Sequence, residues 1–357
     1  MCSIRDGGAE ELMAAATSGP AVLEVEDLCV ELGIRETWVQ ALNDVSLTIR
    51  RGEVLGLVGE SGSGKSLTAL SVSRLLPENA RVLSGSIRLM GEDVLAKSEP
   101  ELNLMRARTL ALVFQNPTSY LNPVLTVGEQ IAEIFELNPA LLGEAPGGGP
   151  FARRRRRRLA WRKSVDYLGL VNIPDPERIV TQYPFQLSGG MQQRVVIAMA
   201  LARQPSLIIA DEITTALDVT IQAQILTLLS DLRRTVGMTL LLITHDLGIV
   251  AQLADRVAVM YSGSIVECSD VTSLFRDAKH PYSRALLETV PTIQGSQSGF
   301  RPIPGAVPAL TDPPSGCRFH PRCAYVFDPC ARLRPLPIAT GPRDTVSCHR
   351  YGVTPGE

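Results

Sequence analysis

Residues 59–66, GESGSGKS, constrain the fold of this 357-residue chain more than any other stretch. They fit the pattern G-x-x-x-x-G-K-[ST], follow the apolar run EVLGLVG at 53–59 and precede a helical pattern at 66–76. The glycines let the backbone wrap around a phosphate, while the N-terminus of the helix directs its N–H groups toward the anion. A flexible Gly/Ser turn is the alternative, but it does not require the strand–loop–helix context found here. We therefore predict a phosphate-binding loop within an α/β fold.

The side chains of this loop predict a nucleoside triphosphate with Mg²⁺ as the ligand. Lys65 is expected to bind the β- and γ-phosphates, and the hydroxyl of Ser66 to coordinate Mg²⁺. The other loop residues expected to contact ATP are Gly59, Ser61, Gly62, Ser63, Gly64 and Leu67.

A second stretch, SLIIADE at 206–212, places carboxylates after another buried strand. Ligands of open α/β sheets bind at the carboxyl ends of the strands, which is where Asp211 emerges. We expect Asp211 to hold Mg²⁺, usually through water, and Glu212 to polarise the attacking water. An exposed acidic pair that merely ends a strand is the alternative, but the phosphate loop already calls for a metal partner.

Alternating strand and helix signals predict an α/β architecture. Short, almost wholly apolar runs suit parallel strands covered on both faces, at 53–59, 110–115, 206–211 and 239–244. Helical patterns lie between them, at 66–76, 191–203 and 220–235. Residues 22–32 and 45–49 alternate apolar and polar residues, as half-buried antiparallel strands do.

Residues 118–180 interrupt this core and are expected to be mainly helical. Inside them, NPALLGEAPGGGP at 138–150 and RRRRRR at 153–158 predict a flexible surface loop. The arginines suit a solvated loop. The alternative is a specific role, in which they contact anionic lipid head groups or an acidic partner.

The composition is that of an ordinary soluble protein, with 45% hydrophobic residues and a formal charge of −2. This small net charge does not predict binding to nucleic acid or to a membrane surface. The longest apolar run, at 195–202, is far shorter than the about 18 residues that a spanning helix needs. Residues 1–20 lack a basic start followed by an apolar block, so we expect a loose, disordered tail, no secretory signal and a cytoplasmic location.

Leu187–Arg194, LSGGMQQR, precedes SLIIADE and resembles the signature of ATP-binding-cassette (ABC) ATPases. Physically it is another helix N-terminus, where Ser188 can cap while Gly189 and Gly190 leave the backbone open to an anion. The resemblance covers roughly residues 22–290 and implies a RecA-like P-loop NTPase core with an antiparallel β subdomain and an inserted α-helical subdomain. It also implies two cassettes arranged head to tail, with ATP between the loop of one and the signature of the other.

The same resemblance assigns roles to further positions. Gln115 matches the glutamine that touches Mg²⁺ and the attacking water and contacts the membrane partner. His245 matches the histidine that contacts the γ-phosphate, and residues 215–218 match the loop through which the two subunits sense each other. The remaining expected nucleotide contacts are Gln192, Asp218 and Trp38, the last as a candidate for stacking on adenine. Ile213 stands where the family often has proline, which should alter only the turn after Glu212.

The C-terminal sequence HPYSRALLETVP at 280–291, with GCRFHPRC at 316–323, is similar to the extension of oligopeptide/dipeptide importer ATPases. We accordingly expect a tail at 1–20, an ABC ATPase domain at 21–290 and a small, irregular, Cys-rich module at 291–357.

Four cysteines with the spacing C-x5-C-x6-C-x17-C lie in this module: Cys317, Cys323, Cys330 and Cys348. In a reducing compartment such a group suits zinc or an iron–sulfur cluster, and the resemblance favours [4Fe–4S], which members of this branch carry in the tail. Zinc, with His320 or His349 as substitute ligands, and reduced thiols in a small packed lobe are the alternatives. The arginines expected to offset the charge of a cluster are Arg318, Arg322, Arg332 and Arg334.

The resemblance implies an ATPase that drives the import of di- or oligopeptides through a permease that this chain does not contain. Its expected partners are a second, related ATPase subunit, two transmembrane permease subunits and an extracytoplasmic peptide-binding protein, at the cytoplasmic face of the membrane and without nucleic acid. Import of nickel or another small solute is one alternative. A soluble ABC ATPase acting on DNA or ribosomes is another, although a single cassette without a long insertion does not suit it.

Overall fold

The computed structural model describes residues 19–35, 37–145, 147, 149–213, 218–289 and 303–352. The expected tail, apart from residues 19 and 20, lies outside these ranges. The chain divides into two compact units. Unit 1 comprises Met1–Ser98 and Thr239–Glu357, and unit 2 comprises Glu99–Met238.

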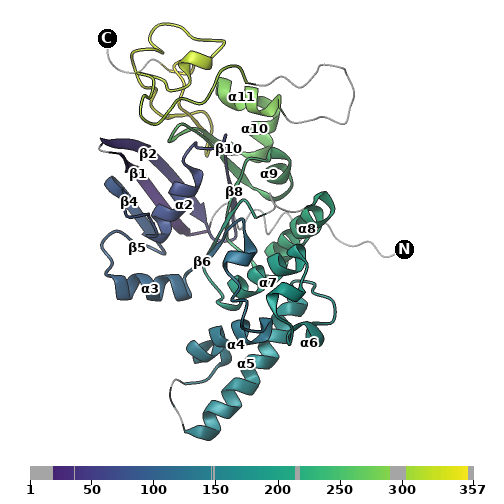
Figure 1. Ribbon diagram of the computed structural model, residues 1–357. Helices are drawn as coiled ribbons and strands as arrows, with labels where there is room; N and C mark the ends of the chain where they lie inside the picture. Colours follow the sequence, from purple (N-terminus) through teal and green to yellow (C-terminus); the bar gives the residue numbers. More distant parts are fainter. Residues whose placement is uncertain are drawn as a thin grey trace. The chain divides into compact units, whose positions relative to one another are not determined.

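A parallel group of buried strands forms the centre of unit 1 (Figure 1). Strand β3 (Val54–Val58) pairs in parallel with β8 (Leu240–Thr244) on one side and with β9 (Arg256–Tyr261) on the other. Every residue of β3 and β8 is buried, which is why these runs are almost wholly apolar. Helix α2 (Lys65–Ser73) follows β3, and α9 (Leu247–Leu253) follows β8.

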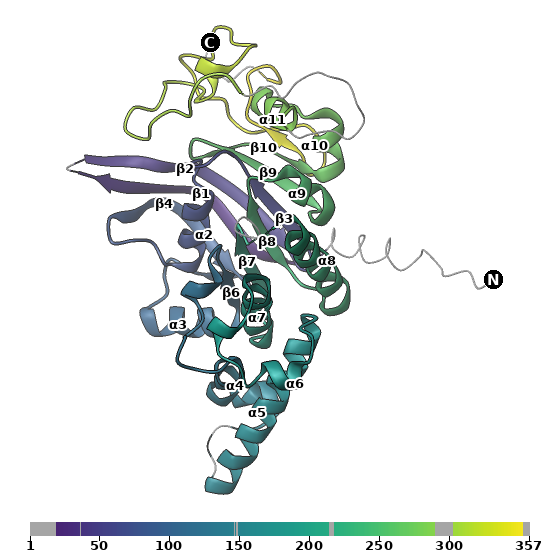
Figure 2. The same ribbon diagram turned by 45° about the vertical axis from the view of Figure 1, so that its right-hand side comes forward.

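An antiparallel sheet with the order β2-β1-β4-β5 forms the other layer of unit 1. Its strands are β1 (Ala21–Ile34), β2 (Thr37–Arg50), β4 (Ala80–Leu89) and β5 (Glu92–Asp93). The expected strand at 45–49 is longer than predicted, because β2 pairs with β1 from Thr37 to Arg50 (Figure 2).

The last part of unit 1 extends the parallel strands by antiparallel pairing. Strand β10 (Ser264–Asp270) pairs with β9, and helices α10 (Val271–Asp277) and α11 (Pro281–Leu287) follow it. Residues 303–352 hold little regular structure: the 3₁₀ turn η4 (His320–Arg322) and the two-residue strands β11 (Ile338–Ala339) and β12 (Thr345–Val346). β12 nevertheless pairs with β10, with Val346 opposite Glu267, so this segment is joined to the sheet.

Unit 2 combines two parallel strands with a group of helices. Strands β6 (Leu110–Val113) and β7 (Leu207–Asp211) pair in parallel. The helices are α3 (Glu99–Arg108), α4 (Val127–Leu137), α5 (Pro150–Leu170), α6 (Pro176–Ile179), α7 (Gly189–Ala202) and α8 (Val219–Val236). In the described ranges no helix combines the length and the apolarity that crossing a bilayer requires.

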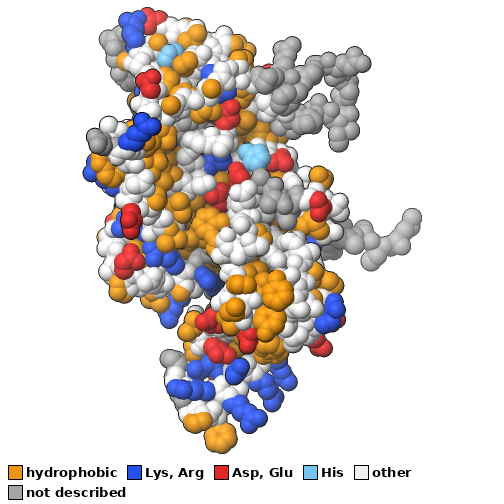
Figure 3. All heavy atoms as spheres, viewed as in Figure 1, with side chains coloured by type: hydrophobic (Ala, Val, Ile, Leu, Met, Phe, Trp, Pro, Cys, Tyr) orange, Lys and Arg blue, Asp and Glu red, His pale blue; other side chains and the backbone are white. Residues whose placement is uncertain are grey.

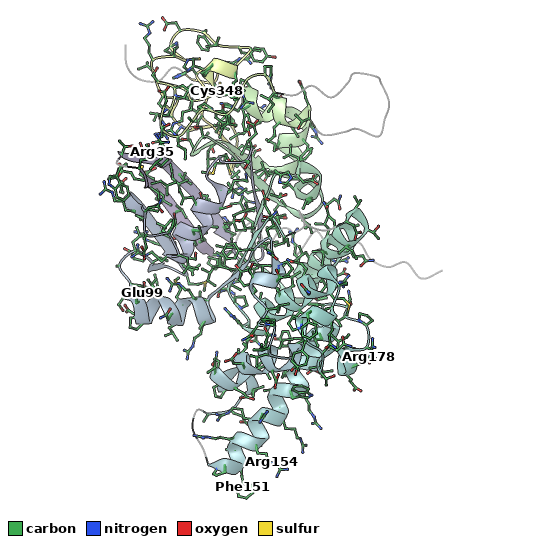
Figure 4. All side chains as sticks on the ribbon, viewed as in Figure 1. Arg35, Glu99, Phe151, Arg154, Arg178 and Cys348 are labelled. Atoms are coloured by element: carbon green, nitrogen blue, oxygen red, sulfur yellow. The ribbon has the colours of Figure 1, made fainter. Side chains whose placement is uncertain are left out.

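The expected loop of arginines is wrong, because Arg153–Arg158 lie in the first turns of α5. Arginine has a high helix propensity, and Pro150 occupies the first helical position, which it favours. Arg156 donates to the carbonyl oxygens of Ala145 and Gly147 and pairs with Glu144, so the helix also orders the chain before it. Figure 3 shows basic side chains around this end of the unit, and Figure 4 labels Phe151 and Arg154 there.

A close approach at Gly128 joins the helices of unit 2. A Cβ atom there would lie 2.5 Å from Cγ2 of Val180 and 2.8 Å from the ring of Trp161 in α5. We expect Gly128→Ala to lower the free energy of unfolding by about 1–3 kcal/mol, because a packed core does not accept the extra methyl group. Urea unfolding followed by circular dichroism measures this effect.

Gly169→Ala in α5 is the matched control, since its nearest neighbour would be Pro176 at 4.0 Å. Alanine is favoured over glycine in a helix by roughly 1 kcal/mol, so this variant should be as stable as the wild type or more stable. Equal destabilisation by both substitutions would contradict the packing argument.

Candidate functional site

The backbone of residues 59–64 requires glycine at two positions. A Cβ atom on Gly59 would lie 2.1 Å from the carbonyl oxygen of Met260 in β9, and one on Gly64 would lie 2.7 Å from Leu42. Gly64 also has a φ of 107°, in the left-handed region that side chains disfavour. Gly64 is the N-cap residue of α2 and brings no side chain that could cap it, so the first N–H groups of the helix face the loop. This is the geometry that binds phosphate.

Lys65 lies under this loop, with a buried side chain. Its Nζ donates to the carbonyl oxygens of Gly59, at 2.8 Å, and Glu60, at 3.0 Å. Ser66 is exposed one residue further on, as a hydroxyl that coordinates a metal must be. Residues 59–66 therefore offer backbone N–H groups, one cation and the exposed hydroxyl of Ser66.

His245 leaves the sheet beside the phosphate loop. Val58, which ends β3, is paired with Thr244, which ends β8, so Gly59 and His245 follow neighbouring strand ends. Asp246 caps α9 by accepting from the N–H groups of Gly248 and Ile249, and this cap fixes the backbone that follows His245. The side chain of His245 is exposed.

Trp38 lies in β2, 46% exposed, with the guanidinium of Arg81 stacked 4.1 Å from its ring centre. The strand that carries it also supplies Leu42, which packs against Gly64 of the phosphate loop. One face of the indole is thus covered by a cation.

The acidic site predicted in unit 2 gathers at the ends of two paired strands. Val113 of β6 is opposite Ala210 of β7, so Gln115 and the Asp211–Glu212 pair emerge side by side. Asp211 is buried, at 7% exposure, whereas Gln115 is exposed. Glu212 has a φ of 49°, a conformation that costs a residue with a side chain about 1–2 kcal/mol and that is concentrated at functional sites.

The pKa of Tyr120 reflects this acidic environment. Partial burial, together with the nearby charge of Asp211, raises its pKa to about 12. Its ring stacks on Phe114, which directly precedes Gln115, at a centroid distance of 5.5 Å.

The signature segment forms the start of α7, as its sequence predicts. Ser188 is the N-cap and accepts from the N–H group of Met191. Gly189 is open to solvent, whereas a Cβ atom on Gly190 would lie 2.6 Å from Ile221 of α8. One glycine therefore leaves space on the surface and the other permits close packing of two helices.

Two other residues predicted to contact the nucleotide have local structural roles. The amide of Gln192 is buried and donates to the carbonyl oxygens of Pro184 and Leu187, which fixes the turn before the signature. Asp218 caps α8 by accepting from the N–H group of Ile221. Residues 215–217 of the expected subunit-sensing loop lie outside the described residues.

The predicted residues thus form two sets. Unit 1 carries the phosphate loop, His245 and Trp38, and unit 2 carries Gln115, Asp211, Glu212, the signature and Asp218. Within each unit, residues far apart in sequence meet at neighbouring strand ends.

The four C-terminal cysteines line one small cavity, together with Phe319, His320 and His349. Burial raises the pKa of Cys317 to about 11, and also raises the pKa of the Cys323 and Cys348 thiols. Among the described residues, no three His, Cys, Asp or Glu side chains form a group that could hold a metal ion. One ring nitrogen of each histidine lies near a backbone carbonyl, of Cys317 and of Leu333 respectively. Figure 4 labels Cys348 in this segment.

The arginines expected to offset the charge of a cluster bond elsewhere. Arg322 pairs with Glu60, Arg334 with Asp44 and Arg332 with Asp328, and Arg318 donates to the carbonyl oxygen of Ser262. An arginine that is already paired with a carboxylate adds little net positive charge nearby, so this expectation is wrong for Arg322, Arg332 and Arg334.

Sequence reasoning missed one contact at the phosphate loop. The hydroxyl of Tyr282 accepts from the N–H group of Glu60 at 2.9 Å. His280 is fully buried, which lowers its pKa to about 3, and its neutral Nδ1 accepts from the N–H group of Tyr282. The His-Pro-Tyr sequence at 280–282 could have pointed to this contact, because it forms the start of α11 and carries Tyr282.

Comparisons with known proteins match these features. The model of the ABC transporter family matches residues 42–215, and that of the oligopeptide/dipeptide transporter C-terminal region matches residues 266–330. A dipeptide transport ATP-binding protein from Haemophilus influenzae is 43% identical over 329 residues, which is 92% of this chain and 95% of that protein. An oligopeptide transport ATP-binding protein from Mycobacterium tuberculosis is 44% identical over 94% of this chain, which spans 53% of that longer protein.

Solved structures agree with this comparison. A dimeric ATP-binding cassette in a post-hydrolysis state, bound to ADP and Pi, has a TM-score of 0.58 and 27% identity to this chain. The match covers 70% of this chain and 98% of the cassette.

Gly59→Ala tests the close approach that shapes the phosphate loop. Because the new methyl group would overlap the carbonyl oxygen of Met260, the loop must move, and we expect MgATP affinity to fall at least about tenfold. Calorimetric titration of the purified chain measures the affinity.

Gly62→Ala is the control, since its Cβ atom would lie in open space and only the positive φ opposes it. A smaller loss of affinity is therefore expected. If the two variants bound MgATP equally well, the steric argument would fail.

Proposed function

The chain belongs to the ABC transporter family, and on this premise we propose that it is the ATP-hydrolysing subunit that drives peptide import through a separate permease. The observation that carries the proposal is the combination of the phosphate loop with the C-terminal region of oligopeptide/dipeptide transporters at residues 266–330. This combination favours peptides, rather than nickel or another small solute, as the transported substrate. It also favours a transport ATPase over a soluble ABC ATPase that acts on DNA or ribosomes. We propose an ATPase domain at 21–290 and a C-terminal module at 291–357.

The roles of the residues follow from their chemistry. The N–H groups of residues 59–66 and the ammonium of Lys65 bind the phosphates and stabilise the charge that develops as the γ-phosphoryl group is transferred. Ser66, Gln115 and Asp211 supply the oxygen ligands that Mg²⁺ prefers. Mg²⁺, when bound, neutralises charge on the β- and γ-phosphates.

Hydrolysis needs a base and an orienting group at the γ-phosphate. Glu212 accepts a proton from the attacking water, and its left-handed backbone supports this role because such strain is concentrated at reacting centres. His245 contacts the γ-phosphate and orders the attack. Gln115 aligns the water and transmits the presence of nucleotide to the permease.

A second ATPase subunit completes the nucleotide site, and the permease subunits respond to its closure. The open N-terminus of α7 at Ser188 and Gly189, with Gln192 in the same helix and Asp218 at the start of α8, faces the ATP of a second ATPase subunit, and Trp38 stacks on adenine. Closure of the two subunits around ATP moves two permease subunits at the cytoplasmic face of the membrane, and an extracytoplasmic protein delivers the peptide. Exposed stacked aromatics support a protein-binding surface in unit 2: Phe185 is 70% exposed and lies 5.6 Å from the ring of Tyr183.

For the cysteine cavity we propose a [4Fe–4S] cluster. All four thiols line one cavity, as a polynuclear cluster needs. Thiolate ligation would also compensate the burial that raises the pKa of Cys317, Cys323 and Cys348.

Anaerobic purification tests this ligand. We expect a brown protein with absorbance near 400 nm and about four iron atoms per chain. Cys348→Ser should lower the iron content, whereas Cys268→Ser, in β10, should not. Colourless wild-type protein that contains zinc or no metal would contradict the cluster.

Glu212→Gln tests the proposed base. The amide cannot accept the proton, so ATP hydrolysis by the assembled transporter should fall by about a hundredfold or more, with ATP binding retained. Phosphate release and nucleotide titration measure the two quantities. Glu177→Gln, at an exposed carboxylate of α6, is the control; normal hydrolysis in Glu212→Gln would exclude the assignment.

A further inference from the structure

Glu60 places a carboxylate inside the loop that binds phosphate. It is the second residue of GESGSGKS, and its backbone carbonyl accepts from Lys65. A bare carboxylate there would repel a triphosphate, because charges of like sign in a partly buried site interact strongly. The loop therefore needs a means of neutralising Glu60.

Arg322, from the far end of the chain, supplies the opposite charge. Its Nη1 donates to Oε2 of Glu60 at 2.8 Å and its Nη2 to Oε1 at 3.0 Å, the paired geometry in which arginine binds carboxylates most strongly. The side chain of Arg322 is only 5% exposed, so solvent screens this pair weakly.

The remaining N–H groups of Arg322 fix its position. Its Nε donates to the carbonyl oxygen of Pro304 at 2.8 Å, Nη2 approaches that of Ile303, and Nη1 approaches the hydroxyl of Tyr261. The guanidinium therefore has an acceptor in each of the directions in which it can donate. An ordinary surface ion pair has no such support.

A buried aromatic cluster holds the two sides together. Tyr282, whose hydroxyl accepts from the N–H group of Glu60, lies 4.6 Å from Tyr261 and 5.3 Å from Phe319 between ring centres. Phe319 also lines the cysteine cavity, and Arg322 is in η4, directly before Cys323. Arg322 of the C-terminal segment thus fixes the side chain of Glu60, and Tyr282 of α11 fixes its backbone.

We propose that Arg322 is a positioning residue of the nucleotide site: it neutralises Glu60 and holds that carboxylate away from the phosphates. Through Arg322, the Cys-rich segment sets the affinity of the cassette for ATP. This inference concerns nucleotide binding alone and does not depend on the transported substrate or on what occupies the cysteine cavity.

A double-mutant comparison of the full chain tests the proposal. Arg322→Ala leaves Glu60 unpaired, so MgATP should bind about tenfold more weakly in calorimetric titrations. The defect should shrink as KCl is raised, because it is electrostatic. In Glu60→Gln/Arg322→Ala the repelling charge is absent, so the affinity should return to within about twofold of that of Glu60→Gln alone.

Arg334→Ala is the matched control, since Arg334 joins the same segment to Asp44 and Asn43 of β2, neither of which belongs to the phosphate loop. It should lower the unfolding midpoint as Arg322→Ala does and leave MgATP affinity unchanged. Arg322→Lys keeps the charge without the paired geometry and should give an intermediate affinity.

Three results would overturn the proposal. The first is unchanged MgATP affinity in folded Arg322→Ala. The second is a double variant that binds as weakly as Arg322→Ala, and the third is a defect that salt does not alter. Either of the last two would mean that Arg322 acts only by supporting the fold.

Discussion

The close approach of Gly59 to the carbonyl oxygen of Met260 determines where the phosphate loop leaves the sheet. This contact is possible only because β3 and β9 are neighbouring parallel strands and residue 59 has no Cβ atom. Further along the loop, the carbonyl oxygen of Ser63 accepts from the N–H group of Gly263, in the turn that follows β9. The loop is thus fixed at two points before any ligand binds, and its N–H groups need little reorganisation to meet phosphate.

Much of this arrangement can be predicted from local sequence. The apolar runs that we expected to be buried strands form β3, β6, β7 and β8, each within two residues of the predicted ends, because full burial on both faces leaves an unambiguous pattern. The helices after residues 64, 188 and 218 are also recognisable, because each begins at a residue suited to the N-cap position or a close turn.

Other features depend on contacts that a single sequence does not reveal. The run of arginines in α5 predicted a charged loop. The helix propensity of arginine and the position of Pro150 nevertheless favour a helix, which packs against α4. The bond between Glu60 and Tyr282 and the pairing of Glu60 with Arg322 join residues 222 and 262 positions apart. The local pattern shows a glutamate in a glycine-rich loop and an arginine near cysteines, and only the fold brings them together. The roles assigned to Gln115, Glu212 and His245 remain predictions, although neighbouring strand ends place them suitably within their own units.

The distance in sequence between Glu60 and Arg322 has a consequence for biosynthesis. A ribosome completes the phosphate loop first, and it adds the arginine that neutralises Glu60 only 262 residues later. Domains begin to fold while translation continues, so an unfinished or C-terminally truncated product would carry a recognisable cassette with an uncompensated acidic loop. Such a product would bind ATP more weakly than a chain that includes Arg322.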